Sequence, residues 1–299
     1  MTSVDDANVV ISEQRASASF HLNRLIPDEP VTRIRPASFW EGIDFSELWW
    51  HREVLYFLMW RDIKVRYKQT VMGVAWLVLQ PILMTTVFAI FLGKLMKVPS
   101  DGVPYPIFAY ASLLVWTFVS NATLSSSYSL VISAHIITRV YFPRLLIPAA
   151  AIGVRALDFL IAAGVLIGLL IYYRVPLTRA ALMFPVFVLM ITALTLALGL
   201  LGASLNVRYR DVGTMLPILL QAWMFVSPIV YASSIVPVRL RFLYALNPLV
   251  GIMDGFRASL FNLPFDWPGI VTAAAITLPL LIVSVHVFCR MESRFADDV

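Results

Sequence analysis

The feature that most constrains this chain is a series of about six apolar runs, each near the length of a bilayer crossing. They occupy residues 71–93, 106–128, 145–173, 181–205, 212–232 and 269–289. A helix needs roughly 20 apolar residues to cross the hydrocarbon core. The chain is 60% hydrophobic and 14% charged, whereas soluble domains are about half apolar and a quarter charged. The sequence therefore predicts an all-α integral membrane protein with six transmembrane helices.

Lysines and arginines are distributed unequally between the two sides of this array. Fifteen of the 23 fall on the side of the N-terminus and seven on the other side. Because loops rich in Lys and Arg stay in the cytoplasm, this bias predicts that both termini are cytoplasmic. Residues 1–43 are polar and lack the apolar core of a signal peptide, so we expect a disordered cytoplasmic tail there. Residues 291–299 form a second, short cytoplasmic tail.

Residues 44–68, just before the first apolar run, mix aromatic, aliphatic and basic side chains at helical spacing. One predicted face carries Trp49, Tyr56, Trp60, Ile63 and Tyr67, and most charges fall on other faces. An aromatic-rich amphipathic helix with basic residues lies in the plane of the membrane interface. The alternative is a soluble helix packed on a cytoplasmic domain, but the chain offers no sizeable domain of that kind. We therefore predict an interface helix, followed by a six-span membrane domain over 69–290.

Segment 233–268 is apolar but is interrupted by Pro237, Pro248 and Pro264. Its pieces are too short to cross a bilayer. Two re-entrant half-helices, which enter from the outer side before the last span and turn back, fit this pattern. Irregular backbone at membrane depth is tolerated where protein or a water-filled cavity covers it, which indicates a pathway. The alternative is a hairpin in the outer interface with no role in a pore.

The sequence lacks the patterns of several catalytic and cofactor sites. None of its lysines lies in the Gly-x4-Gly-Lys-[Ser/Thr] frame that binds nucleotide phosphates. Its single cysteine, four scattered histidines and dispersed carboxylates show no metal-ligand spacing. We therefore expect no metal, no cofactor and no enzymatic activity in this chain, with a membrane glycosyltransferase as the less favoured alternative. An ion-coupled transporter is disfavoured because no internal repeat is visible.

Two pairs of ionisable residues stand at i and i+3, a spacing that lets side chains meet on one helix face. Arg155 and Asp158 lie in the third run, and Asp254 and Arg257 lie in the interrupted segment. Ionisable residues at membrane depth are candidates for function. The interpretation that we favour for both pairs is nevertheless structural, because such a pair offsets the cost of its own burial.

The spans also contain aromatic residues on which the apolar face of a sugar ring could stack. They are Trp76, Phe88, Trp116, Trp223, Phe225 and Tyr231. For any one of these residues, contact with lipid or with another helix is the simpler explanation.

Five stretches together resemble one family. In order, they are RDIKVRYKQTVMGVAWLVLQP, HIITRVYFPRLLIP, NVRYRDVG, SPIVYASSIVP and NPLVGIMDGFR. They are similar to segments in the membrane subunits of bacterial ABC-2 polysaccharide exporters, and the resemblance covers about 45–290. It implies a homodimer in the bacterial inner membrane, joined to two copies of a separate P-loop ATPase subunit that binds ATP and Mg²⁺. The cargo would be a lipid-linked glycan, with O-antigen as the first expectation and teichoic acid or capsular polysaccharide as alternatives; no nucleic acid partner is expected.

The resemblance also implies roles for individual residues. The ATPase would be coupled through Ile132, His135, Ile136, Ile137, Arg139, Val140 and Tyr141, with a lesser contact at Arg208 and Arg210. The cargo headgroup would meet Trp60, Arg61, Lys64, Arg66 and Lys68. The six aromatic residues named above would line the channel. An outer gate would be formed by Asn247, Pro248, Asp254 and Arg257.

Overall fold

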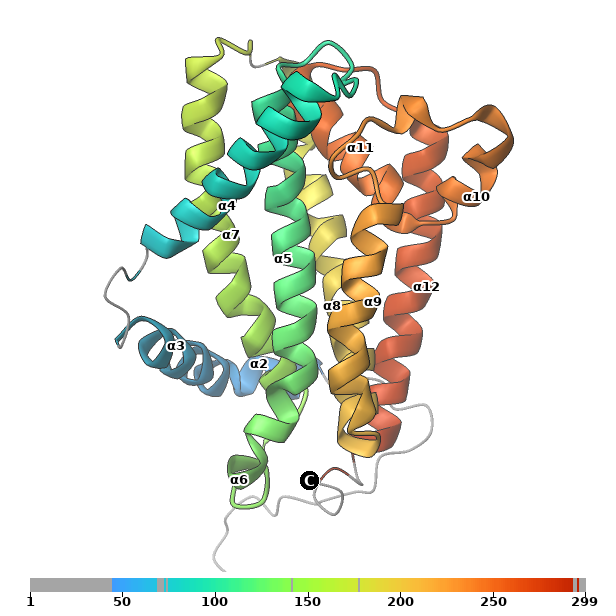
Figure 1. Ribbon diagram of the computed structural model, residues 1–299. Coiled ribbons are helices and arrows are strands. Elements are labelled where there is room, and N and C mark those ends of the chain that lie inside the picture. The colour runs from blue at the N-terminus through green and yellow to red at the C-terminus, as the bar shows by residue number, and fades with distance from the viewer. Residues whose placement is uncertain are drawn as a thin grey trace, which may run out of the picture. The chain divides into compact units, whose positions relative to one another are not determined.

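The computed structural model describes residues 45–68, 73, 75–140, 142–176, 178–292 and 295. These residues belong to one compact unit, Gly42–Val299, are largely helical and contain no strand (Figure 1). The prediction of an all-α integral membrane fold is confirmed. The predicted N-terminal tail, 1–43, lies outside the described residues, as does most of the short C-terminal tail.

Five helical stretches in the described part of the chain are long and apolar enough to cross a membrane. The first, Ala75–Leu95, joins α4 (Ala75–Phe88) to the π-helix η1 (Ala89–Leu95), and the fourth, Arg179–Arg208, joins the 3-10 turn η2 (Arg179–Met183) to α8 (Phe184–Arg208). The other three are α5 (Tyr105–Ile132), α7 (Leu146–Tyr172) and α12 (Trp267–Glu292). They coincide with five of the predicted runs.

The remaining predicted run forms α9 (Asp211–Val226), a shorter apolar helix of 16 residues. At 1.5 Å per residue it is about 24 Å long, less than the roughly 30 Å of a bilayer core. It ends before Pro228 rather than at 232, because a residue that precedes proline is pushed out of helical geometry. The sixth crossing therefore stays a prediction.

Helix α5 forms the centre of the helical bundle, with α7 and α8 packed against it (Figure 1). Small residues allow α5 and α8 to approach closely. A Cβ added to Gly202 would lie 2.0 Å from Ser127 Oγ, and one added to Gly199 would lie 2.6 Å from Ser126 Oγ. Helices in membranes gain packing contacts from such small residues, so this interface fixes the position of α5.

The interrupted segment contains short helices, as predicted, and the longest is α11 (Pro248–Phe261). It is preceded by two 3-10 turns, η3 (Ser233–Ile235) and η4 (Val238–Leu240), and by α10 (Arg241–Ala245). The Asn247 side chain caps α11 by accepting a hydrogen bond of 3.1 Å from the backbone N–H of Leu249. Whether these helices re-enter the membrane stays a prediction.

Two glycines let α11 pack tightly between α12 and α8. A Cβ on Gly251 would lie 2.2 Å from the carbonyl oxygen of Gly269, and one on Gly255 would lie 2.0 Å from the Phe187 ring. Gly251 and Gly255 are four residues apart, so they share one face of the helix. As a result α11 is buried almost throughout its length.

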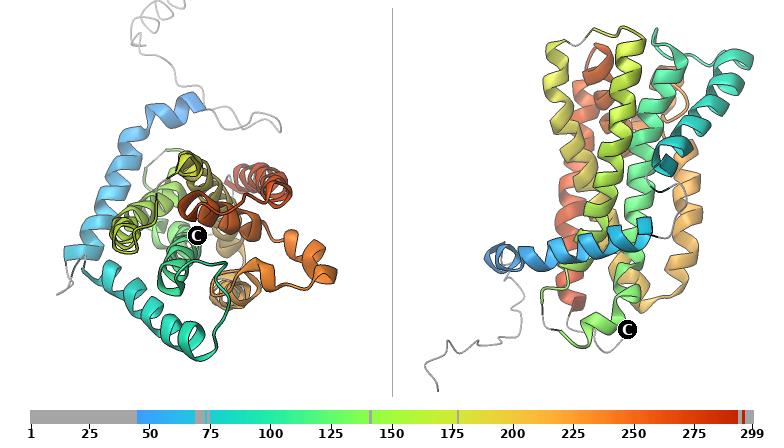
Figure 2. Two further views of the ribbon diagram at one scale, coloured as in Figure 1. Left: turned by 90° about the horizontal axis from the view of Figure 1, so that it is seen from above. Right: turned by 90° about the vertical axis from the view of Figure 1, so that its left-hand side faces the viewer.

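The predicted interface helix is formed by α2 (Phe45–Trp50) and α3 (Arg52–Lys68), which lie across the bundle rather than along it (Figure 2). Leu58 is buried against the bundle, whereas Trp49, Tyr56 and Trp60 are exposed. Aromatic and basic side chains share this exposed surface, since Lys64 Nζ lies 5.2 Å from the centre of the Trp60 ring. The two kinds of side chain are therefore less separated than the sequence pattern predicted.

The two ends of the bundle are built differently. The short helix α6 (Ala134–Ile137) and the turn between α8 and α9 lie at one end, and α10 and α11 lie towards the other (Figure 1). Near α6, a second hydrophobic core joins Leu58, Ile137, Phe142 and Phe288. This core fixes α6 and α3 to the same end of the bundle.

Candidate functional site

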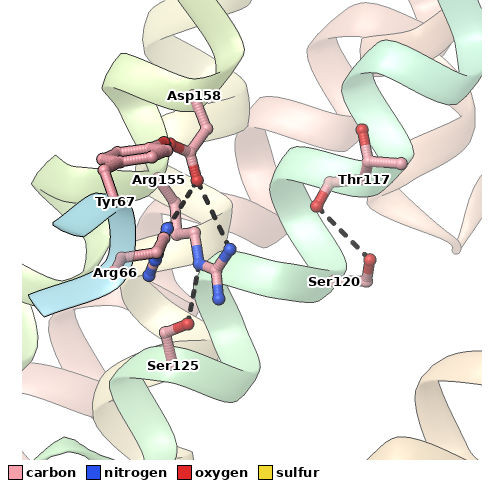
Figure 3. A network of polar contacts seen from close by, with 7 residues as sticks. All are labelled: Arg66, Tyr67, Thr117, Ser120, Ser125, Arg155 and Asp158. Carbon is pink, nitrogen blue, oxygen red and sulfur yellow. Dashed lines mark hydrogen bonds and ion pairs between the residues drawn. The ribbon is translucent and has the colours of Figure 1, made fainter. Parts of the chain in front are cut away.

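A network of ionic and polar side chains joins α3, α7 and α5 (Figure 3). Arg66 Nη1 lies 2.7 Å from Asp158 Oδ2, and Arg155 Nη1 lies 3.3 Å from the same oxygen. The Tyr67 hydroxyl donates a hydrogen bond of 2.6 Å to Asp158 Oδ1. Arg155 Nε donates one of 2.8 Å to Ser125 Oγ. One carboxylate is therefore held by two guanidinium groups and one phenol.

The environment of this network favours a neutral Tyr67. Burial, followed by the hydrogen bond to the Asp158 carboxylate, raises the pKa of Tyr67 to about 12. The phenol therefore remains a hydrogen-bond donor at neutral pH. The Asp158 side chain is 13% exposed, and the Arg66 and Arg155 side chains are 30% and 25% exposed, so solvent reaches the cations more than the anion.

The sequence predicted only part of this network. The i, i+3 pairing of Arg155 with Asp158 is present. Arg66 and Tyr67 were missed as partners because they are 92 and 91 positions from Asp158. The one available signal was that a carboxylate inside an apolar run needs a cation, and the preceding segment is rich in cations.

The residues predicted to meet the cargo headgroup have different partners in the structure. Arg61 pairs with its neighbour Asp62 at 2.8 Å. Lys64 lies over the Trp60 ring, and Lys68 is exposed at the end of α3. Arg66 forms an ionic contact with Asp158 on α7. The predicted residues therefore lie on one helix with separate contacts, and their role at the cargo headgroup stays a prediction.

The predicted coupling segment forms the tip of the bundle at the end that carries α6. Ile132 is 70% exposed and Val140 is 57% exposed, whereas Ile137 is only 6% exposed and packs in the core. His135 and Arg139 are exposed and Ile136 is half-buried, while Tyr141 lies outside the described residues. Arg208 and Arg210 are exposed in the α8–α9 turn, where the Arg208 guanidinium lies 5.5 Å from the Tyr209 ring centre. Ile137 therefore holds α6 in place and its neighbours are available to a partner.

The connection after α6 is fastened to the end of α12. The backbone N–H of Arg144 donates a hydrogen bond of 2.9 Å to Glu292 Oε1, and the Arg144 guanidinium donates to the Glu292 carbonyl. Phe295 is fully buried beside Phe288, with 5.2 Å between ring centres. These contacts hold the coupling segment against the C-terminal end of α12.

At the other end, polar contacts join the end of α9 to the start of α11. Trp223 Nε1 donates a hydrogen bond of 3.1 Å to Asn247 Oδ1, and Asn247 Nδ2 donates one of 2.9 Å to Ser227 Oγ. Trp116 packs edge-on against Trp223 at 5.9 Å. Pro248 follows as the first residue of α11. The predicted gate residue Asn247 is thus a junction between two helices.

Arg257, the cation of the predicted gate, is almost fully buried. Its side chain is 2% exposed, its guanidinium lies 4.3 Å from the Phe108 ring centre, and it donates to the Pro228 carbonyl. Asp254 is 3.9 Å away. These contacts tie α11 to α5 and to the residues after α9.

The six predicted channel aromatics do not form one cluster in this chain. Trp116 contacts Trp223, and the Tyr231 hydroxyl donates a hydrogen bond of 3.2 Å to the Phe225 carbonyl. Trp76 is 54% exposed on α4, whereas Phe88 is half-buried at its end. The ring-to-ring contact between Trp116 and Trp223 is therefore the main link within the set.

A polar face on α5 was not identified from the sequence. Thr117, Ser120, Asn121 and Ser125 recur at helical spacing; Asn121 is exposed and the other three are half-buried. Helices α4 and α9 both contact α5, and few of their residues are buried. Beside this face, an apolar groove of about 400 Å³ lies between α5, α8 and α9, with Thr123, Leu201, Met215 and Trp223 among its lining residues.

Among the described residues, no group of three His, Cys, Asp or Glu side chains could hold a metal ion.

The sequence comparisons place this membrane-spanning architecture in a family. Residues 53–261, from α3 to the end of α11, match the ABC-2 type transporter family. The chain belongs to that family. It is therefore a transporter membrane subunit, and the family is one of multi-pass membrane proteins, in agreement with the apolar helices.

Curated relatives match most of the chain. A Myxococcus xanthus protein named "O-antigen export system permease protein RfbA" is 27% identical over 258 residues, which cover 85% of this chain and 98% of that relative. A Klebsiella pneumoniae protein of the same name is 25% identical over 238 residues, or 79% of this chain and 91% of the relative. The similarity thus extends over most of each protein and not over one motif.

Proposed function

We propose that this chain is the permease of an ATP-driven exporter that moves a lipid-linked polysaccharide, O-antigen in the first instance, to the outer face of the bacterial inner membrane. The observation that carries this proposal is the nearly full-length similarity to permeases named for O-antigen export, together with the family match. The permease would act as a homodimer with two separate ATPase subunits. ATP and Mg²⁺ would bind to those subunits, since this chain has no P-loop lysine.

The exposed tip around α6 supports a docking role. Ile132 and Val140 are large exposed aliphatic side chains at the end of the bundle that also carries the cations of the α8–α9 turn. Exposed aliphatic side chains flanked by polar groups are typical of protein–protein contacts. We assign them to the ATPase contact, and the buried Ile137 to the attachment of the tip. A push on the tip would then be transmitted to α5 and α7, which flank it in the chain.

The polar face of α5 supports a route for sugars. Hydroxyl and amide groups at Thr117, Asn121 and Ser125 can exchange hydrogen bonds with a glycan. In a single copy this face lacks a complete wall, because α4 and α9 leave it partly exposed. A second copy facing it would close a polar channel.

The proposal is tested by co-purification and by export. The tagged chain is purified in mild detergent from cells that contain its genomic ATPase partner, and bound proteins are identified by mass spectrometry. Val140→Asp should abolish ATPase recovery and export, whereas Leu240→Asp should leave ATPase recovery unchanged. The two positions are matched, with exposures of 57% and 52%, but they lie at opposite ends. Recovery of intact chain without any P-loop ATPase would contradict the proposal.

A further inference from the structure

The network at Asp158 has the composition of an anion site that is already occupied. Two guanidinium groups approach one carboxylate oxygen, at 2.7 Å and 3.3 Å. They come from different elements, Arg66 from α3 and Arg155 from α7. Because two positive charges face one negative charge, the group of three retains a net positive charge. A ligand with more negative charge and more acceptor oxygens than a carboxylate would neutralise it better.

Exposure decides which side of the network a ligand can reach. The two arginine side chains are 30% and 25% exposed, and the Asp158 side chain is 13% exposed. The cations are therefore the more accessible groups, and the carboxylate lies behind them. Guanidinium groups match the geometry of phosphate oxygens and can bind two at a time.

The site also lies beside the proposed route for sugars. Arg155 donates to Ser125, which belongs to the polar face of α5 together with Thr117 and Ser120 (Figure 3). A phosphate group bound by Arg155 would place an attached sugar next to that face. The other arginine belongs to the interface helix α3, which bears exposed aromatic side chains that suit a lipid.

We propose that Arg66 and Arg155 form a binding site for a phosphate group of the lipid-linked cargo, and that Asp158 is a built-in competitor that occupies this site when no cargo is bound. This inference rests on the proposed function, because it assigns the headgroup position of the same cargo. Cargo binding would displace Asp158 from Arg66 and loosen one end of α3 from α7. The packing of Leu58 would keep the rest of α3 attached.

The test measures binding of farnesyl diphosphate to the purified full-length chain in phosphatidylcholine nanodiscs. Asp158→Asn removes the competing charge and retains the shape, so we expect binding about tenfold tighter than that of the wild-type chain. Arg155→Gln should weaken binding at least as much. Asp62→Asn is the matched control. It removes a carboxylate that pairs with Arg61 on α3, and it should leave the affinity for farnesyl diphosphate unchanged.

Further arms separate the sources of phosphate. Inorganic pyrophosphate should compete with farnesyl diphosphate, whereas phosphatidylglycerol at equal phosphate concentration should compete poorly. Equal competition by phosphatidylglycerol would overturn the cargo assignment in favour of bulk lipid. Unchanged or weaker binding by Asp158→Asn, with Asp158→Ser as a second neutral variant if the first does not fold, would overturn the competitor role. ATPase recovery in the co-purification is independent of these results, so failure of the proposed function remains distinguishable.

Discussion

Two arginine–aspartate pairs with the same spacing in the sequence have opposite surroundings in the structure. Arg155 and Asp158 are partly exposed, and a third charge, Arg66, joins them from another helix. Arg257 is 2% exposed, is 3.9 Å from Asp254, and is held mainly by the Phe108 ring and the Pro228 carbonyl. The first pair is an ionic contact that solvent can reach, and the second is part of the packing.

The difference teaches that spacing predicts a contact but not its role. A cation that is almost fully buried depends on fixed partners, because removing any of them leaves a polar group unsatisfied. A cation at a helix crossing with access to solvent can exchange partners at small cost. We therefore expect mutations in the Asp254–Arg257 pair to affect folding. Mutations in the Arg155–Asp158 pair should affect helix attachment and binding.

The largest effect is expected for Arg257→Met. This change removes the buried cation and leaves the Pro228 carbonyl and Asp254 without their partner, which should cost about 3 kcal/mol or more. Thermal unfolding in detergent should show a large fall in the midpoint temperature. Arg239→Met is the control, since Arg239 is exposed on η4. Equal midpoints for the two variants would show that Arg257 is not part of the packing.

A smaller effect of about 2 kcal/mol is expected for Gly251→Ala. The new Cβ would lie 2.2 Å from the Gly269 carbonyl oxygen, a backbone atom that cannot rotate away. Gly164→Ala on α7 is the matched control, because a Cβ there would meet no atom within 4 Å. The control should be neutral or slightly stabilising. The comparison is made by thermal unfolding, and a tolerated alanine at 251 would contradict the close packing of α11.

Asp158→Asn should lower global stability by only about 1 kcal/mol, because its cationic partners are partly exposed and screened. Its effect should instead be local. Hydrogen–deuterium exchange should become faster in the last turns of α3, while exchange in α11 stays unchanged. Faster exchange in both α3 and α11 would contradict the distinction between the two arginine–aspartate pairs.

The smallest effect is expected for Tyr67→Phe, and it should depend on pH. Because the pKa of Tyr67 is raised from 10.0 to about 12 in the folded protein, its stabilising contribution is complete below pH 10 and is lost as pH rises towards 12. The difference in unfolding temperature between the wild-type chain and this variant should therefore be constant from pH 6 to 9 and shrink above pH 10. A difference that changes between pH 6 and 9 would assign the titration to another group.

The sequence predicted the positions of the helices better than the contacts between them. Apolar runs located the long helices because length and hydropathy are local properties. The end of α9 was misplaced because the apolar run continues past Pro228 to 232 while the helix ends at Val226. Within α7, the pairing of Arg155 with Asp158 followed from helix geometry alone. The partnership with Arg66 depends on how α3 lies across the bundle, which no local pattern contains.

The same limit applies to the coupling segment. The family resemblance assigned Ile132, Ile137 and Val140 alike to ATPase coupling, and in the structure Ile137 is buried while the other two are exposed. All three are large aliphatic residues, so composition cannot separate a docking residue from an anchoring one. The second hydrophobic core, which contains Phe142 and Phe288, decides which of the three residues is buried.

The brace between Arg144 and Glu292 has a consequence for biosynthesis. The residue that fastens the connection after α6 is translated much later than α6 itself, since Glu292 follows Arg144 by 148 positions. During translation the coupling segment is therefore synthesised well before Glu292, the residue that holds it in place. A chain interrupted before residue 292 would present α6 without this support, so the proposed attachment to the ATPase would depend on translation through α12.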